Sequence, residues 1–194
     1  MDTDELDAKV RAYVARGQAD RATEKILREY GDELARYLRS QLSAEADAQE
    51  AFSRMSEELW KSLSRFDGRC SVRTWCYMLA RHAAIYIRTL PRHQREQLVS
   101  SIPSVQQAAT EMWSNSYVEG VHQREVYVEA KDALEPDDRT LLVLRIDRNL
   151  SWREIAVVLL GEDADDDAVT RKAAALRKQF ERVKDELAKK LGKA

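Results

Sequence analysis

The stretch SWREIAVVLLGEDADDDAVTRKAAALRKQF, residues 151–180, determines the structure expected for the C-terminal part of the chain. Ser151 and Glu154 have the spacing of a capping box, in which each side chain accepts a hydrogen bond from the other residue's backbone N–H. Gly161 can end the helix that they begin, and a second helix is expected to start near residues 167–168. A short helix, a turn and a longer helix in this order are typical of a helix-turn-helix.

Apolar residues in both helices are spaced so that the two helices can pack on each other. The residues expected to face inward are Ile155, Ala156, Leu159 and Leu160 on the first helix, and Val169, Ala173, Leu176, Phe180, Val183 and Leu187 on the second. The candidate DNA-contacting residues on the other face of the second helix are Thr170, Arg171, Lys172, Arg177 and Lys178. Basic side chains placed in this way can reach phosphates and guanine edges in the major groove. The alternative is an ordinary helical hairpin with a charged outer face.

Helical periodicity also precedes this motif. Amphipathic helices are expected before residue 91, each with one apolar face, as in a small helical bundle. Ser71 can cap the last of these helices, which follows a turn at Phe66-Asp67-Gly68-Arg69. Further helices are expected over residues 121–134 and between Pro136 and Asn149.

A serine- and glutamine-rich stretch near residues 100–116 indicates a linker between two domains. Met112, Trp113 and Tyr117 are apolar exceptions, which could pack on a neighbouring domain or dock on a partner. We therefore predict an all-α fold with two small helical domains joined by a flexible linker. The predicted first domain, linker and second domain are residues 1–95, 96–125 and 126–194.

The net charge of −2 conceals two basic segments. Residues 65–95 carry a net charge of +6 and residues 168–194 carry the same, whereas residues 161–167 hold five acids and no base. Because nucleic acids are attracted by local positive patches, an acidic total does not exclude DNA binding. The alternative interpretation is that both basic segments are solvated helix faces.

Several function classes are not favoured by the sequence. No apolar run approaches the ~20 residues that a membrane span needs, and the acidic start lacks the apolar core of a signal peptide. We therefore expect a cytoplasmic protein without membrane insertion. The three histidines have no metal-ligand spacing and no serine or cysteine lies in a nucleophile motif, so we expect no enzyme activity, cofactor or metal. Cys70 and Cys76 are expected to be ordinary reduced thiols.

Two segments resemble the sigma-70 family of RNA polymerase sigma factors, and specifically its small two-domain extracytoplasmic-function (ECF) group. Residues 65–75, RFDGRCSVRTW, followed by Leu79-Ala80-Arg81, resemble region 2 of that family. Residues 134–145, LEPDDRTLLVLR, and 149–156, NLSWREIA, resemble the start of region 4. The two resemblances stand in the family's order and are separated by the predicted linker.

The resemblance implies an alternative sigma factor, which binds core RNA polymerase and directs it to specific promoters without catalysis. Region 4 would read the −35 element as duplex, and region 2 would capture the −10 element as the strands separate. Capturing a separated strand calls for cations and for aromatic or polar groups. The candidate −10 residues are Arg65, Phe66, Asp67, Arg69, Arg73, Trp75, Arg81, His82, Tyr86 and Arg88, of which Trp75 is the one more typical of a core. An anti-sigma protein is a further partner that the resemblance implies.

The chain departs from the family's pattern in the third helix, whose surface meets polymerase in that family. The candidate polymerase-binding residues are Asp47, Glu50, Ser53, Arg54 and Glu57. Ser53 and Arg54 stand where the family usually has a glutamine followed by an acid, so this contact could use altered residues. Tyr86 likewise replaces a frequent acid in region 2.

The acidic turn at residues 161–167 is longer than is usual in the family. Its acids could simply cap and solvate the start of the final helix while pointing away from DNA. Alternatively they repel phosphates and weaken −35 binding. In the second case, replacing Asp165, Asp166 and Asp167 by asparagine raises the affinity for promoter DNA.

Two other function classes fit part of the sequence. A helix-turn-helix transcriptional regulator that acts without core polymerase needs only the C-terminal motif, and a helical interaction protein needs no DNA contact at all. The segment 65–95 favours the sigma factor, because a simple regulator does not require it.

Overall fold

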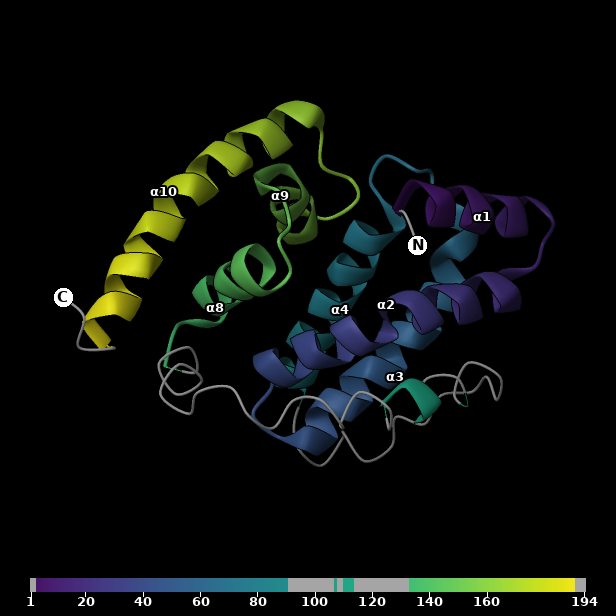
Figure 1. Cartoon of the computed structure of the whole chain (residues 1–194), viewed down its shortest axis with the longest axis horizontal. Helices are drawn as coiled ribbons and strands as arrows, with labels where there is room; N and C mark the ends of the chain where they lie inside the picture. Colours follow the sequence, from purple (N-terminus) through teal and green to yellow (C-terminus); the bar gives the residue numbers. More distant parts are fainter. Residues whose placement is uncertain (1–2, 91–106, 108–109, 114–132, 191–194) are drawn as a thin grey trace. The chain divides into compact units, whose positions relative to one another are not determined.

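The computed structural model describes residues 3–90, 107, 110–113 and 133–190 (Figure 1). Within these ranges every regular element is a helix and no strand occurs, which confirms the predicted all-α fold.

The chain divides into two compact units, Met1–Glu119 and Gly120–Ala194. The predicted linker at 96–125 and the helix expected at 121–134 lie mostly outside the described residues. The predicted domain boundaries therefore stay predictions.

The first unit is a helical bundle around one apolar core. Its elements are α1 (Thr3–Ala15), α2 (Ala19–Gln41), α3 (Glu45–Ser62), the short 3-10 helix η1 (Leu63–Arg65) and α4 (Val72–Thr89). The core includes the fully covered side chains of Leu6, Ile26, Leu34, Leu38, Leu59 and Ile87. Burying one such side chain contributes roughly 1.5–3 kcal/mol, so the apolar faces read from the sequence hold the bundle together.

The start of α4 is built as the sequence predicts. The hydroxyl of Ser71 accepts a hydrogen bond from the backbone N–H of Thr74 at 3.1 Å, which satisfies one of the amides that a helix start leaves unpaired. In the turn before it, Gly68 has a φ of +77°, a conformation that costs little only in glycine. The turn and the cap together fix where α4 begins.

Two residues of the predicted linker pack on the first unit. Trp113 is only 7% exposed and lies against Phe52 of α3, with 5.7 Å between the ring centroids. The guanidinium of Arg39 on α2 lies 3.9 Å from the Trp113 ring centroid. Beside it, Met112 fills the space over Gly31, because a Cβ at Gly31 would lie 3.2 Å from the Cβ of Met112. For Met112 and Trp113, packing on a helical domain is therefore the alternative observed, and Tyr117 lies outside the described residues.

The second unit contains the short helix, the turn and the long helix that the sequence predicts for residues 151–180. Its elements are α8 (Pro136–Leu142), the five-residue π-helix η2 (Val143–Asp147), α9 (Trp152–Leu160) and α10 (Asp166–Lys190). The capping box of Ser151 and Glu154 is present, and Gly161 ends α9 with a φ of +95°. The predicted inward stripe of α10 is buried from Val169 to Leu187, and the rings of Trp152 and Phe180 meet edge to face at 5.3 Å.

The inward face of α9 differs from the prediction at its end. Leu160 was expected to be buried but is 42% exposed, and Leu159 is only half-buried. Val158 takes the inward position together with Ile155. At about 100° per residue, Leu160 is rotated roughly 140° from Ile155, so it turns away from the side that α10 covers.

The C-terminal half of α10 is tied to the first turn of α8. Asp138 of α8 is buried, and its Oδ1 accepts a hydrogen bond from the side-chain amide of Gln179 at 2.6 Å. Its other oxygen lies 3.6 Å from the guanidinium of Arg182. One buried carboxylate therefore fixes the position of α8 along the long helix.

In the described part of the chain, no helix has both the length and the apolar surface needed to cross a membrane. The same residues contain no cluster of histidine, cysteine, aspartate or glutamate that could hold a metal ion. Cys70 and Cys76 form no disulfide, and burial raises the pKa of the Cys76 thiol well above its usual range.

Candidate nucleic-acid interface

The turn between η1 and α4 is a compact polar loop braced by an aromatic pair. The carboxylate of Asp67 accepts hydrogen bonds from the backbone N–H of Arg69 at 3.0 Å and from its Nε at 2.6 Å. The backbone bond to Arg69 contributes most to holding the pKa of Asp67 below its usual value. Phe66 packs on Trp75 with 4.9 Å between the ring centroids. The loop therefore presents its arginines from a defined backbone.

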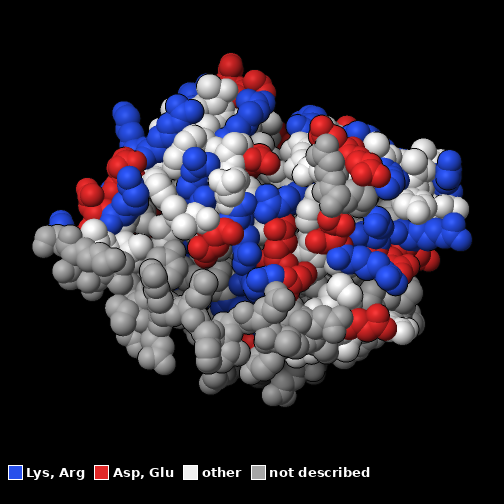
Figure 2. All heavy atoms as spheres, in the orientation of Figure 1, with Lys and Arg blue, Asp and Glu red and all other residues white. Residues whose placement is uncertain are grey.

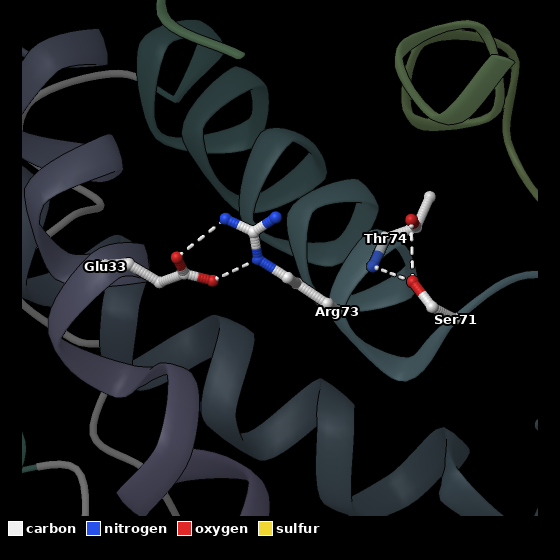
Figure 3. A network of polar contacts seen from close by, with 4 residues as sticks. All are labelled: Glu33, Ser71, Arg73 and Thr74. Carbon is white, nitrogen blue, oxygen red and sulfur yellow. Dashed lines mark hydrogen bonds and ion pairs between the residues drawn. The ribbon is translucent and has the colours of Figure 1, made fainter. Parts of the chain in front are cut away.

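Arg73 is held by an acid that the sequence did not single out. Its Nε and Nη2 donate to the two carboxylate oxygens of Glu33 on α2, at 2.8 and 2.9 Å (Figure 3). These hydrogen bonds raise the pKa of Arg73 further above its usual value. Through these two hydrogen bonds Arg73 joins α4 to α2. Because the same guanidinium donors already bind Glu33, Arg73 is poorly placed to bind a phosphate.

The ten candidate −10 residues differ in how far they are exposed. Trp75 is 2% exposed and belongs to the core, which agrees with the expectation that this residue is more typical of a core than of a DNA contact. The exposed candidates are Arg65, Asp67, Arg69 and His82; the half-buried ones are Phe66, Arg73, Arg81, Tyr86 and Arg88. Three of the four exposed residues, Arg65, Asp67 and Arg69, lie at the turn, and His82 is exposed on α4.

The five candidate polymerase-binding residues share one half-buried side of α3, at Asp47, Glu50, Ser53, Arg54 and Glu57. The guanidinium of Arg54 lies 3.6 Å from the ring centroid of Tyr86 on α4. Burial raises the pKa of Glu50, and the positive charge of Arg54 opposes this shift. The two positions at which the chain departs from the family's acids are therefore in direct contact.

The outer face of α10 carries the basic residues that the sequence predicts. Thr170, Arg171, Arg177 and Lys178 are exposed, and Lys172 is half-buried. Within the described part of the chain, the four cations make no ion pair with a carboxylate. In Figure 2, lysine and arginine side chains line the edge formed by α10, with acidic side chains among them. This face is thus open to an anionic partner.

Two acids of the long turn have structural roles. The Oδ1 of Asp165 accepts a hydrogen bond from the backbone N–H of Ala168 at 2.6 Å and so caps α10. Asp166 pairs with Arg153 of α9. These contacts favour the capping interpretation for Asp165 and give Asp166 a partner on α9.

Sequence reasoning missed the residues that act through distant contacts. Glu33 and Arg73 are 40 positions apart, and Asp138 and Gln179 are 41 apart. Asp7 of α1 accepts a hydrogen bond from the backbone N–H of Val72, 65 positions away. No local pattern identifies such partners, because each depends on how the helices pack.

Comparison with known proteins gives one family match. Residues 26–95 match the family model of sigma-70 region 2, a segment that includes α3, the braced turn and α4. No curated protein and no solved structure matches the chain significantly. The match covers 70 of the 194 residues, and it supports a sigma factor role in transcription initiation.

Proposed function

We propose, with the sigma-70 region 2 match as the premise, that this chain is an alternative sigma factor of the ECF group. It binds core RNA polymerase, reads the −35 element through α9 and α10, and captures the melted −10 element through the turn before α4. The observation that carries the proposal is that the matched segment, residues 26–95, contains the exposed arginines of that turn. The proposal includes a cytoplasmic location, an anti-sigma protein as partner, and no catalytic activity.

The chemistry of the turn suits a separated DNA strand. Arg65 and Arg69 supply exposed cations, and His82 adds an exposed polar ring on the same helix that the turn begins. Cations attract the phosphates of a single strand, while rings and polar edges can meet its unstacked bases. In duplex DNA the bases are stacked on each other, so the rings and polar edges would have no unstacked bases to contact.

The chemistry of α10 suits duplex DNA. The helix follows a capped partner helix and a turn, and it presents Arg171, Arg177 and Lys178 on its outer face. In helix-turn-helix proteins the second helix enters the major groove, where arginine and lysine reach guanine edges and phosphates. The same arrangement also fits the alternative function, a DNA-binding regulator that acts without core polymerase.

The test is initiation by reconstituted holoenzyme. The purified chain is mixed with core RNA polymerase and a genomic DNA library, and the 5′ ends of the transcripts are sequenced. We expect transcripts that start downstream of shared −35 and −10 sequences. If the chain shifts duplex DNA but supports no initiation with core polymerase, the regulator is the correct assignment. If it binds no DNA at any salt concentration with core present, both assignments are wrong.

Variants locate the two DNA contacts within that assay. Arg177→Ala together with Lys178→Ala should weaken binding to duplex −35 DNA and reduce its salt dependence. Arg69→Ala should instead impair the melted complex. Arg28→Ala is the matched control and should change neither, because Arg28 is an exposed arginine on α2 that pairs with Glu24 one helical turn before it.

A further inference from the structure

The helix α1 lies outside the family match but is part of the first unit's core. Leu6 and Val10 are fully buried, whereas the match begins at residue 26. The side chain of Thr3 forms a hydrogen bond with that of Tyr30 on α2. A helix anchored in this way can place its other side chains at fixed positions on the unit.

Asp7 of α1 reaches the start of α4. It is 7% exposed, and its Oδ1 accepts a hydrogen bond from the backbone N–H of Val72 at 3.1 Å. Ser71 satisfies the N–H of Thr74, so two different segments pair the amides of the same helix start. Burial raises the pKa of Asp7, and the bond from Val72 is the largest opposing influence. α1 therefore fixes the end of the turn to which Arg69 belongs.

Arg11 lies one helical turn after Asp7 and reaches the turn itself. Its Nη1 is 3.5 Å from the place that a Cβ at Gly68 would occupy. The neighbouring arginines already have carboxylate partners, since Arg69 pairs with Asp67 at 2.6 Å and Arg65 lies 3.7 Å from Glu58. In the described part of the chain the exposed guanidinium of Arg11 makes no hydrogen bond or ion pair.

We propose that α1 completes the strand-capture surface of the first unit. Arg11 binds a phosphate of the single-stranded DNA that crosses the turn, and Asp7 is a positioning residue that holds the turn and α4 in register for this contact. The inference rests on the proposed function, and it assigns α1 a part in DNA binding that the matched segment does not contain.

The test of Arg11 measures how the holoenzyme binds a fluorescent single-stranded −10 oligonucleotide over a series of salt concentrations. Arg11→Gln should lower affinity severalfold and reduce the slope of log K against log[salt] by about 0.7, the value for one phosphate on a single strand. Arg16→Gln, which removes the same charge from an exposed position after α1, should leave both quantities unchanged. If Arg11→Gln behaves like Arg16→Gln, the inference is wrong.

The test of Asp7 separates positioning from stability. Asp7→Asn keeps an oxygen acceptor for Val72 and should bind the oligonucleotide like the wild type. Asp7→Ala removes the acceptor and should weaken binding while its far-UV circular dichroism shows a folded chain. If Asp7→Ala unfolds, the Arg11 measurement still decides the main claim.

The same assay distinguishes this inference from the proposed function. A wild-type holoenzyme that fails to bind the oligonucleotide contradicts the sigma factor assignment. A wild-type holoenzyme that binds it, with no effect of Arg11→Gln, contradicts only the role of α1.

Discussion

The guanidinium of Arg54 on α3 stacks over the ring of Tyr86 on α4, 3.6 Å from the ring centroid. One partner belongs to the proposed polymerase-binding side and the other to the proposed strand-capture side. The contact therefore joins the two surfaces that the proposed function assigns to core polymerase and to single-stranded DNA.

We expect a stabilising coupling between these two residues. A cation over an aromatic face contributes ~0.5–2 kcal/mol, depending on how far the pair is desolvated, and both residues are half-buried. A double-mutant cycle of Arg54→Ala and Tyr86→Ala, followed by urea unfolding, should give a coupling energy of about 1 kcal/mol. A coupling energy near zero would show that the stacking contributes nothing to the fold.

Breaking the Glu33–Arg73 pair should destabilise the first unit more than breaking an exposed pair. The side chains of Arg73 and Glu33 are 24% and 22% exposed, and two charged hydrogen bonds join them. We expect Arg73→Ala to lower the free energy of unfolding by about 2 kcal/mol. The exposed pair of Arg28 and Glu24 provides the control, because Arg28→Ala should cost less than about 0.5 kcal/mol.

The same pair predicts an indirect effect on DNA. If Arg73 acts by joining α4 to α2, Glu33→Ala should weaken single-strand capture although it removes a negative charge. An affinity that rises in Glu33→Ala would instead indicate that Arg73, once released, binds the DNA itself.

Asp7 should make stability fall as pH rises. Burial raises its pKa in the folded protein, so the folded state holds the proton more tightly than the unfolded state. The difference in bound protons lowers stability as pH rises above about 4, the ordinary aspartate value, until the folded carboxyl has lost its proton. Asp7→Asn should therefore gain stability relative to the wild type as pH rises above about 4. A relative stability that does not change with pH would contradict the shift.

Trp113 should stabilise the first unit although it lies in the predicted linker. Its ring is buried against Phe52 and Arg39, so Trp113→Ala should lower the free energy of unfolding of the first unit by about 3 kcal/mol. Gln107→Ala, an exposed residue of the same segment, should change it by less than about 0.5 kcal/mol. Equal effects of the two variants would mean that the segment does not dock in solution.

The acids of the long turn should differ in their effect on duplex DNA binding. Asp166→Asn releases Arg153 from its ion pair, so affinity for −35 duplex should rise more than in Asp167→Asn, which removes the same charge. Equal affinities for the asparagine variants of Asp165, Asp166 and Asp167 would indicate that only total charge matters.

The cap of α10 at Asp165 should contribute to stability. Asp165→Asn keeps a capping side chain and should leave helix stability nearly unchanged, whereas Asp165→Ala should cost about 1 kcal/mol.

Local signals in the sequence predicted the local structure well. The cap at Ser71, the capping box at Ser151 and the helix end at Gly161 each depend on side chains within a few residues of the backbone they contact. The apolar stripe of α10 was also predicted correctly, because 25 residues give many turns over which to detect a period. The nine-residue α9 has few turns from which to detect a period, and the prediction placed its last leucine, Leu160, on the wrong side.

What the sequence could not predict depends on packing between helices. Glu33 looks like any solvated acid of α2 until α4 places Arg73 beside it. Gly31 looks like an interruption of modest cost in the same helix until Met112 fills the space above it. For the same reason the sequence did not distinguish Arg73 from the arginines of the turn as a candidate −10 residue, and it did not indicate α1 as part of the DNA-binding surface.

The carboxylate of Asp138 holds the C-terminal half of the long α10 in place. The helix spans 25 residues, about 37 Å, and Asp138 contacts it at Gln179 and Arg182, beyond the basic residues that would meet the major groove. The other end of α10 is held by α9, where Arg153 pairs with Asp166, so two separate contacts set the direction of the helix. In the proposed −35 reader, a substitution at Asp138 should therefore change duplex binding from a buried position outside the basic face.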